Sequence, residues 1–170
     1  MIKNDLSVLA KEDVIKLIGK DWMLVTAGNM TSYNTMTASW GGIGYLWDRP
    51  VAFVFIRPER YTHDFIERED RMTLSFYGEE YRKALQYCGV KSGRNVNKAH
   101  ETGLTPVPTE TESVTFAEAR LTLDCRKLFK TEMTEEAFLD QPVFDEWYKG
   151  PKGGGFHTIY VVEIENVYTR

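Results

Sequence analysis

Two arginines that follow an apolar run are the residues with the clearest chemical purpose in this sequence. Arg57 and Arg60 come directly after Val51–Ile56 and stand next to Tyr61 and Thr62. Guanidinium groups bind phosphate oxygens in a bidentate manner, and a helix beginning near Tyr61 would add unpaired N–H groups and its positive dipole end. The segment therefore predicts a site for a phosphate at a strand-to-helix transition.

A second stretch, Asn34–Gly44, suits a flat aromatic ligand with polar edges. Its first half reads as a strand that carries the hydroxyls of Thr35, Thr37 and Ser39 and then the indole of Trp40. Its second half contains glycines at positions 41, 42 and 44, which we interpret as a bulge, a tight turn or backbone that another group approaches closely. The alternative is an ordinary barrel strand that ends in a flexible turn. A ring site beside a phosphate site has the form of a site for flavin mononucleotide (FMN).

Two further polar features are candidates for the same ligand. The cluster Lys91-Ser92-Gly93-Arg94, followed by Lys98, offers a second arm for a phosphate or a ribityl chain, with a solvated loop as the alternative. His157 follows a glycine-rich loop and begins the last predicted strand, so it is either a residue of the site or a surface histidine.

Composition and missing motifs exclude several other functions. The 170 residues carry a net charge of −4, which gives no electrostatic reason to bind nucleic acid or an anionic membrane. No signal-peptide core and no apolar run of transmembrane length is present, and two distant cysteines fit a reducing cytoplasm. A nucleophile elbow, a clustered Cys/His zinc site and the G-x-G-x-x-G fingerprint are all missing. We expect one domain over residues 1–170, large enough to bury a core without disulfides or a metal.

Hydrophobic periodicity predicts a mainly β protein with a few helices. The expected helices are Ala10–Gly19, Tyr61–Arg68 and Glu79–Cys88, and the expected strands are Trp22–Ala27, Asn34–Trp40, Val51–Ile56, Met72–Phe76, Phe116–Leu128 and His157–Tyr168. The first helix should bury Val14, Ile15 and Ile18, and glycines at 19 and 89 should end the first and third helices. Val51–Ile56 is apolar throughout and should be covered on both faces, whereas Met72–Phe76 alternates as a half-buried strand does. Residues 131–148 are expected to be an irregular excursion, and 149–155 a mobile loop.

Two side-chain features have a plain structural interpretation. Cys88 ends an apolar helical face and is expected to be a packed, inert thiol, the alternative being a thiol that reacts next to the flavin. His63 and Glu67 have a spacing that could hold a metal on a helix, but no second pair accompanies them, so a surface ion pair is expected.

Taken in order, four blocks resemble the flavin reductase-like family, and in particular the flavoredoxin-type branch of the FMN-binding split barrels. The blocks are Asn34–Trp40, Arg57-x-x-Arg60-Tyr61-Thr62, Leu74-Ser75-Phe76 and Cys88-Gly89-x-x-Ser92-Gly93-Arg94. The resemblance implies an antiparallel split β-barrel with peripheral helices, and a homodimer that holds FMN at the subunit interface. It also implies ring and ribityl contacts from Asn34, Met36, Thr37, Ala38, Ser39 and Trp40, and phosphate contacts from Arg57, Arg60, Tyr61 and Thr62, helped by Ser92, Arg94 and Lys98. His157 resembles the histidine that lies near the flavin and the nicotinamide in reductase members, which makes it the candidate catalytic residue.

The resemblance leaves three functions open. The chain is an NAD(P)H-dependent flavin reductase that passes hydride to flavin N5, a flavoredoxin-like electron carrier with tightly bound FMN and a protein redox partner, or a flavin-binding module without redox activity. In the first case NADH or NADPH is the electron donor. Replacing Arg57 by alanine is expected to cost FMN affinity more than stability.

Overall fold

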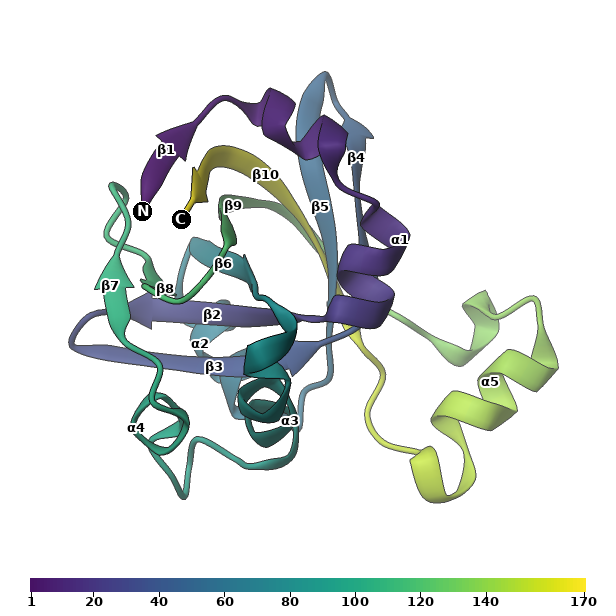
Figure 1. Ribbon diagram of the computed structural model, residues 1–170. Helices are drawn as coiled ribbons and strands as arrows, with labels where there is room; N and C mark the ends of the chain where they lie inside the picture. The colour runs from purple at the N-terminus through teal and green to yellow at the C-terminus, as the bar shows by residue number, and fades with distance from the viewer.

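A computed structural model describes all 170 residues, and its main element is a strongly curved antiparallel sheet (Figure 1). Seven strands follow one another in the order β3-β2-β6-β9-β10-β5-β4, and β1 adds to β10. These strands are β1 (Ile2–Asn4), β2 (Met23–Asn29), β3 (Ser32–Ala38), β4 (Gly41–Leu46), β5 (Arg49–Ile56), β6 (Arg71–Phe76), β9 (Leu121–Glu132) and β10 (Thr158–Thr169). A separate hairpin joins β7 (Pro106–Pro108) to β8 (Val114–Phe116).

The sheet wraps around one apolar core, and its two end strands, β3 and β4, do not pair. The core takes residues from most strands, including Val25, Val54, Leu74, Leu123 and Val162. Short helices lie around the sheet (Figure 1). The predicted class, a mainly β protein with an antiparallel split barrel and peripheral helices, is confirmed.

The helices agree with the prediction in part. They are α1 (Val14–Lys16), α2 (Tyr61–Arg68), α3 (Arg82–Val90), α4 (Lys98–Thr102) and α5 (Gln141–Tyr148), with 3₁₀ turns at Leu6–Lys11, Glu79–Tyr81, Glu135–Ala137 and Gly150–Lys152 and a π-turn at Leu17–Asp21. The helix α2 has the predicted bounds and buries Phe65 and Ile66 as expected. His63 and Glu67 on this helix do not pair, because His63 Nε2 lies 3.0 Å from Thr158 Oγ1 and Glu67 pairs with Lys130.

The predicted helix Ala10–Gly19 is wrong as a single regular element. Extended backbone at Glu12 and Asp13 ends the first 3₁₀ turn, and the Asp13 carboxylate caps a new helical start by accepting from the N–H of Lys16. The change of register leaves Ile15 82% exposed while Ile18 is buried. Gly89 also fails to end its helix, which continues to Val90.

Two strand predictions fail for reasons of tertiary packing. The glycines at 41, 42 and 44 lie within β4, which pairs along β5, rather than in a turn. A Cβ at Gly41 would lie 2.6 Å from Phe53 O, so the alternative of closely approached backbone holds at that position. The strand β6 is buried on both faces. The β7–β8 hairpin covers its polar side, where Thr73 Oγ1 donates to Val114 O and Ser75 Oγ lies 2.8 Å from Thr115 Oγ1.

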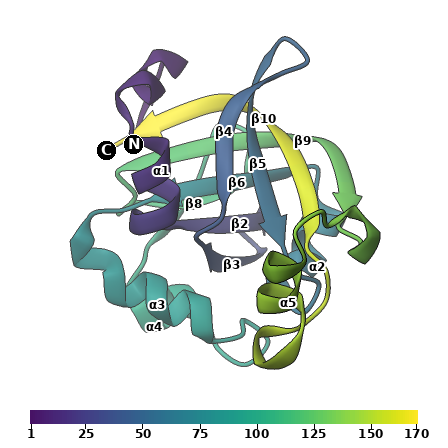
Figure 2. The ribbon, with the colours of Figure 1, turned by 90° about the vertical axis from the view of Figure 1, so that its right-hand side faces the viewer.

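The outer face of β5 and β10 is only partly covered by this chain. Phe53, Phe55 and Ile159 point away from the core and are half-buried, while Trp47 and Phe129, with ring centroids 6.0 Å apart, are 55% and 46% exposed. Figure 2 shows α5 across one end of these strands and no helix across the rest. The prediction that Val51–Ile56 is covered on both faces is confirmed for the core face, and the other face, expected to meet a helix or a second subunit, is only partly covered by this chain.

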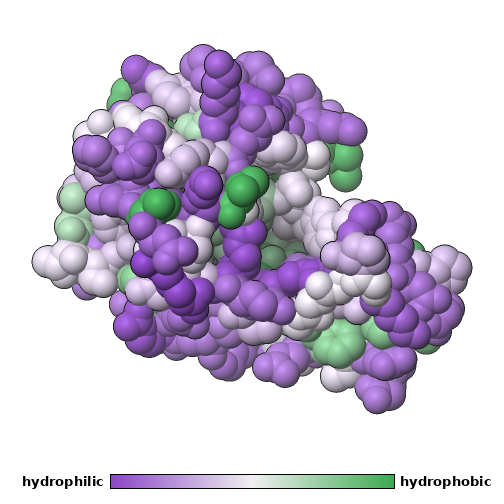
Figure 3. Space-filling model, turned by 90° about the horizontal axis from the view of Figure 1, so that it is seen from below, coloured by the Kyte–Doolittle hydropathy of each residue, from purple (hydrophilic) through white to green (hydrophobic).

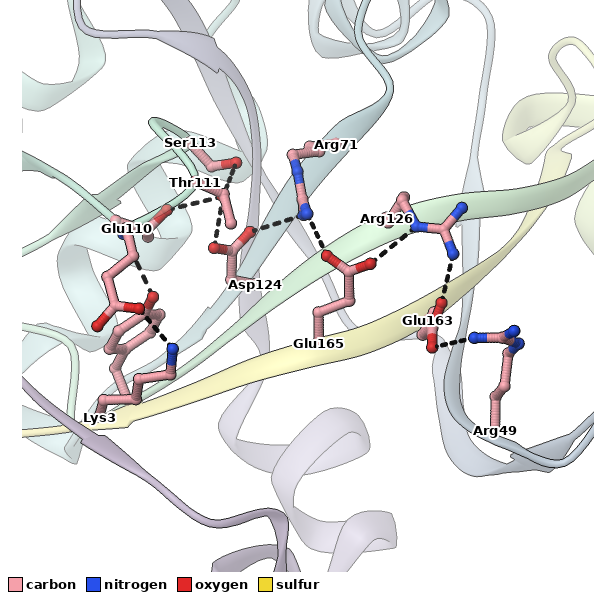
Figure 4. Close-up of polar contacts among 12 residues, drawn as sticks. Lys3, Arg49, Arg71, Glu110, Thr111, Ser113, Asp124, Arg126, Glu163 and Glu165 are labelled. Atoms are coloured by element: carbon pink, nitrogen blue, oxygen red, sulfur yellow. Dashed lines mark hydrogen bonds and ion pairs between the residues drawn. The ribbon is translucent and has the colours of Figure 1, made fainter.

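A ladder of charged side chains crosses the same sheet beyond this apolar area (Figure 4). It runs from Arg49 on β5 through Glu163, Arg126, Glu165 and Arg71 to Asp124 on β9. At its end Asp124 is fully buried, and its Oδ2 accepts from Thr111 Oγ1 at 2.6 Å. The ladder thus ties the hairpin turn to four strands of the sheet. None of the helices is both long and apolar enough to cross a bilayer.

Candidate functional site

A hollow of about 170 Å³ opens where the second half of β3 meets the end of β5 and the start of β10. Its lining contains Met36, Thr37, Ala38, Ser39, Trp40, Phe55, Arg57, Arg60 and His157. We call it the β3 pocket. An adjoining hollow of about 240 Å³, lined in part by Trp22 and Gln86, shares Thr37, Ser39 and Arg60 with it. The structure thus places the end of the predicted segment Asn34–Trp40 against the start of the second predicted segment, which begins at Arg57.

Cations without carboxylate partners surround the β3 strand. Arg57 donates to Trp147 O at 2.7 Å and Arg60 donates to Cys88 O at 3.4 Å, but neither forms an ion pair. Lys98 is buried, and its ammonium donates to Thr35 O at 2.7 Å and Cys88 O at 2.9 Å. An uncompensated buried charge is costly, so this arrangement favours an anionic ligand.

The pKa values of these cations reflect the same arrangement. Burial, followed by repulsion from Arg60, lowers the pKa of Lys98 to about 8. Burial also lowers the pKa of the Arg60 guanidinium from its usual value. Arg60 therefore lies close enough to Lys98 to disfavour its protonated form.

The structure places Asn34, predicted as a ring or ribityl contact, and the remaining predicted phosphate residues outside the β3 pocket. Asn34, Tyr61 and Lys98 line a third hollow, of about 330 Å³, on the first half of β3. Thr62 is fully buried and accepts from Asn34 Nδ2 at 2.8 Å, which is a structural bond between α2 and β3.

Ser92 and Arg94 have local partners of their own. Ser92 Oγ accepts from the N–H of Arg94 at 3.2 Å. The Arg94 guanidinium pairs with Asp64 at 2.7 Å and lies 4.5 Å from the centre of the Tyr61 ring. An arginine held by a carboxylate and an aromatic face is less available to a phosphate than Arg60 is.

His157 is a buried residue of the β3 pocket and not a surface histidine. It is 6% exposed, its ring centre lies 5.4 Å from that of Trp40, and its Nδ1 lies 2.6 Å from the Tyr148 hydroxyl. Burial, with a smaller contribution from Arg57, lowers the pKa of His157 to about 4. The imidazole is therefore neutral at pH 7.

The chain segment between β9 and β10 covers one side of the pocket. Residues 134–155, which we call the α5 arm, stand out from the sheet and leave a hollow between themselves and the body of the molecule (Figures 1 and 3). The predicted loop within it contains a 3₁₀ turn, Gly150–Lys152. Trp147 from α5 packs edge-on against Trp40, with ring centroids 4.8 Å apart.

Sequence reasoning missed several residues at the site. Neither Phe55 nor Tyr148 was singled out as a site residue, whereas the region Trp147–Gly155 as a whole was expected either to shield the flavin or to admit a nicotinamide. The apolar pattern of β5 gave no sign that Phe55 faces a pocket. Contacts between α5 and β3 join parts of the chain separated by about a hundred residues, which no local pattern reveals.

Cys88 has the structural character that was expected. Its side chain is fully buried in a small cluster with Leu85 and Leu104, and burial raises its pKa to about 11. A thiol of such high pKa carries almost no thiolate at neutral pH and is therefore unreactive.

A model of the flavin reductase like domain family matches residues 16–170. The chain belongs to that family. No curated protein sequence matches it closely enough to count as a relative. Because the chain belongs to this family, flavin binding and flavin-related redox chemistry are the functions to consider for the β3 pocket.

Solved structures agree with membership of the flavin reductase-like family. Flavoredoxin from Methanosarcina acetivorans is similar with a TM-score of 0.69 and 20% identity, over 88% of this chain and 68% of that chain. Flavoredoxin of Desulfovibrio vulgaris (Miyazaki F) gives 0.68 and 22%, over 99% and 77%. The NADH:FAD oxidoreductase of Streptomyces globisporus gives 0.65 and 16%, over 88% and 75%. At these identities the similarity establishes a shared fold.

Proposed function

We propose that residues 1–170 form one FMN-binding domain that acts as an NAD(P)H-dependent flavin reductase. The observation that carries the proposal is the set of cations around β3, Arg57, Arg60 and Lys98, none of which has a carboxylate partner. Membership of the flavin reductase like domain family supports a flavin as the anionic ligand that binds to these cations.

The residues present fit FMN by their chemistry. The backbone and hydroxyl groups of the second half of β3 offer donors and acceptors to the edge of a flat ring, and Trp40 offers an aromatic surface. Arg60 belongs to both adjoining hollows and is thus the best candidate to hold the phosphate. The bound flavin would supply the redox centre, accepting a hydride from the reduced nicotinamide at N5.

The protein's own contribution is to bind, orient and shield. Trp40 and Trp147 limit the access of water to one side of the pocket. His157, neutral at pH 7, would donate a hydrogen bond to an electron-rich acceptor on a ligand without adding a charge. No residue of the chain needs to form a covalent bond with substrate.

We further propose a homodimer with FMN at the subunit interface. The support is the apolar outer face of β5 and β10, where Phe53 and Phe55 stand beside the pocket and no segment of this chain covers Trp47 and Phe129. An apolar face of this kind, continuous with a binding site, is typical of a subunit interface. The free, buried thiols Cys88 and Cys125 agree with a protein of the cytoplasm.

A flavoredoxin-like electron carrier is the second candidate, favoured by the position of Trp147. This ring, together with Lys152 4.1 Å from its centre, narrows the open side of the pocket, where a nicotinamide would have to stack. A carrier requires only that electrons reach bound FMN from a protein partner. In that case FMN stays bound and NAD(P)H is a poor donor.

One spectroscopic experiment separates these functions. The purified protein is examined for a visible flavin band, and NADH and NADPH are then added anaerobically in separate cuvettes. Rapid bleaching supports the reductase and names the preferred nucleotide, whereas bleaching by dithionite alone supports the carrier. A flavin band that is bleached by neither the nicotinamide nucleotides nor dithionite supports a flavin-binding module without redox activity. A protein that neither contains flavin nor takes up added FMN contradicts the assignment.

A further inference from the structure

Three parts of the chain meet around the hydroxyl of Tyr148. His157 immediately precedes β10, and its carbonyl accepts from the N–H of Met133, which follows β9, at 3.0 Å. Tyr148, at the end of α5, places its hydroxyl 2.6 Å from His157 Nδ1 and 3.1 Å from Met133 Sδ. The α5 arm thus places the Tyr148 hydroxyl next to the end of β9 and the start of β10, the two strands that it connects.

The direction of the short hydrogen bond follows from the acceptors available to Tyr148. The hydroxyl has a single proton, and the two groups that compete for it are an imidazole nitrogen and a thioether sulfur. A thioether is a weak acceptor, whereas the unprotonated imidazole nitrogen is a strong one. A bond from the Tyr148 hydroxyl to an unprotonated Nδ1 is therefore stronger than the alternative, in which Nδ1–H donates to the hydroxyl oxygen and the hydroxyl proton goes to the thioether.

Burial is the main reason that the ring of His157 stays neutral, and two charged groups modify its pKa. Arg57 also disfavours the imidazolium, while Glu59 has a smaller opposing effect. Glu59 is itself held by the N–H of Gly155. Arg57 thus adds to the larger effect of burial, and a neutral imidazole with an unprotonated Nδ1 must carry its proton on Nε2.

We propose that Tyr148 is a positioning residue that fixes His157 as the Nε2–H tautomer and thereby presents an uncharged hydrogen-bond donor to the β3 pocket. The ligand class that fits is a planar ring with a carbonyl oxygen or an unprotonated ring nitrogen on its edge. Nε2 has no partner within the protein, so its N–H remains for such an acceptor. That the acceptor belongs to flavin or nicotinamide rests on the proposed function, whereas the tautomer does not.

The tautomer can be measured without any ligand. The full chain is labelled with ¹⁵N at its histidines, and the ring nitrogens are followed by NMR between pH 5 and pH 9. Only three histidines are present, and a His157→Gln variant assigns the third ring. The expected result for His157 is a protonated Nε2 and an unprotonated Nδ1 with the chemical shift of a hydrogen-bond acceptor, unchanged over this range.

A Tyr148→Phe variant removes the hydroxyl and keeps the ring among its neighbours Phe138, Phe144 and Phe156. The Nδ1 signal should move to the position of a nitrogen without a donor, and the pKa of His157 should rise so that the ring titrates within the range measured. Tyr45→Phe is the matched control, because it removes a hydroxyl that bonds to Asp48 away from the pocket. Met133→Leu tests the thioether and should leave the Nδ1 signal where it is.

Two results would overturn the proposal. One is a proton on Nδ1 in the unmodified protein, which would make Tyr148 the acceptor. The other is an Nδ1 signal that is the same in Tyr148→Phe as in Tyr45→Phe. If the protein reduces flavin, turnover in Tyr148→Phe should fall by about tenfold, the effect of one hydrogen bond, and gain a new dependence on pH below 7. If it binds no flavin, the NMR result still decides the tautomer.

Discussion

Replacing Arg60 by alanine separates ligand binding from folding more sharply than any other change at the site. The guanidinium is half-buried, has no carboxylate partner and makes one long contact, 3.4 Å, with Cys88 O. It also repels the ammonium of Lys98, whose pKa it lowers. Removing it therefore relieves a like-charge contact and breaks no ion pair, so we expect the free energy of unfolding of the ligand-free protein to stay the same or rise slightly.

The expected effect on FMN is large and in the opposite direction. A hydrogen bond to a charged group contributes about 1.5–3 kcal/mol. The loss of one such bond to a phosphate therefore weakens binding by roughly 10- to 150-fold, and the loss of a bidentate pair weakens it further. Riboflavin shares the ring and the ribityl chain but lacks the phosphate, so its affinity should change by less than about threefold.

The assay is a fluorescence titration of ligand-free protein with FMN and, separately, with riboflavin. Arg94→Ala is the matched control, because Arg94 lies nearby but is already paired with Asp64. An equal loss for the two ligands in Arg60→Ala would mean that Arg60 acts on the ring or on the fold. An effect of Arg94→Ala as large as that of Arg60→Ala would refute the argument from unpaired cations.

Three further outcomes are expected. Arg57→Ala should weaken FMN binding by roughly tenfold or more while leaving stability nearly unchanged. It should also speed proteolysis of the α5 arm, because the hydrogen bond to Trp147 O is lost. Unchanged FMN affinity would show that Arg57 is not part of the phosphate site. The pKa of His157 is about 4 in the folded protein and about 6.5 in the unfolded chain, so its contribution to stability is complete above pH 6.5 and falls by about 3 kcal/mol as the pH drops to 4. Urea unfolding of the protein and of His157→Gln at pH 7 and pH 4.5 measures this change in the free energy of unfolding. Equal pH dependence in the two proteins would contradict the assignment. Phe53→Glu should shift the protein to a monomer in sedimentation velocity, whereas a protein that sediments as a monomer before mutation would exclude the dimer.

Much of the site lies in segments whose local chemistry could be read from sequence. The bounds of the helix α2 are predicted correctly, and the strand predicted at Asn34–Trp40 differs from β3 by two residues at each end. The structure then brings Trp40, Arg60 and His157 to one pocket. Residue type was a weaker guide for Ser92 and Arg94, because an arginine and a hydroxyl satisfied by near neighbours look the same in a sequence as free ones.

The failures share a physical cause, which is packing between distant parts of the chain. Glycines that predict a turn by themselves lie in β4, where the carbonyl of Phe53 on the neighbouring strand leaves no room for a side chain at Gly41. Thr73 and Ser75 alternate as if exposed, yet the β7–β8 hairpin supplies partners for their hydroxyls. In both cases the deciding neighbour comes from another strand of the fold.

The α5 arm leaves and rejoins the sheet at Met133 and His157, which are hydrogen-bonded to each other. Its two ends are thus as close as those of a hairpin loop, so the arm can change in length or sequence during evolution without altering the register of β9 and β10. Yet the arm supplies both Trp147 and Tyr148 to the pocket. Changes in the α5 arm alone could therefore alter which molecules reach the pocket and which ring nitrogen of His157 carries the proton, while the barrel stays constant.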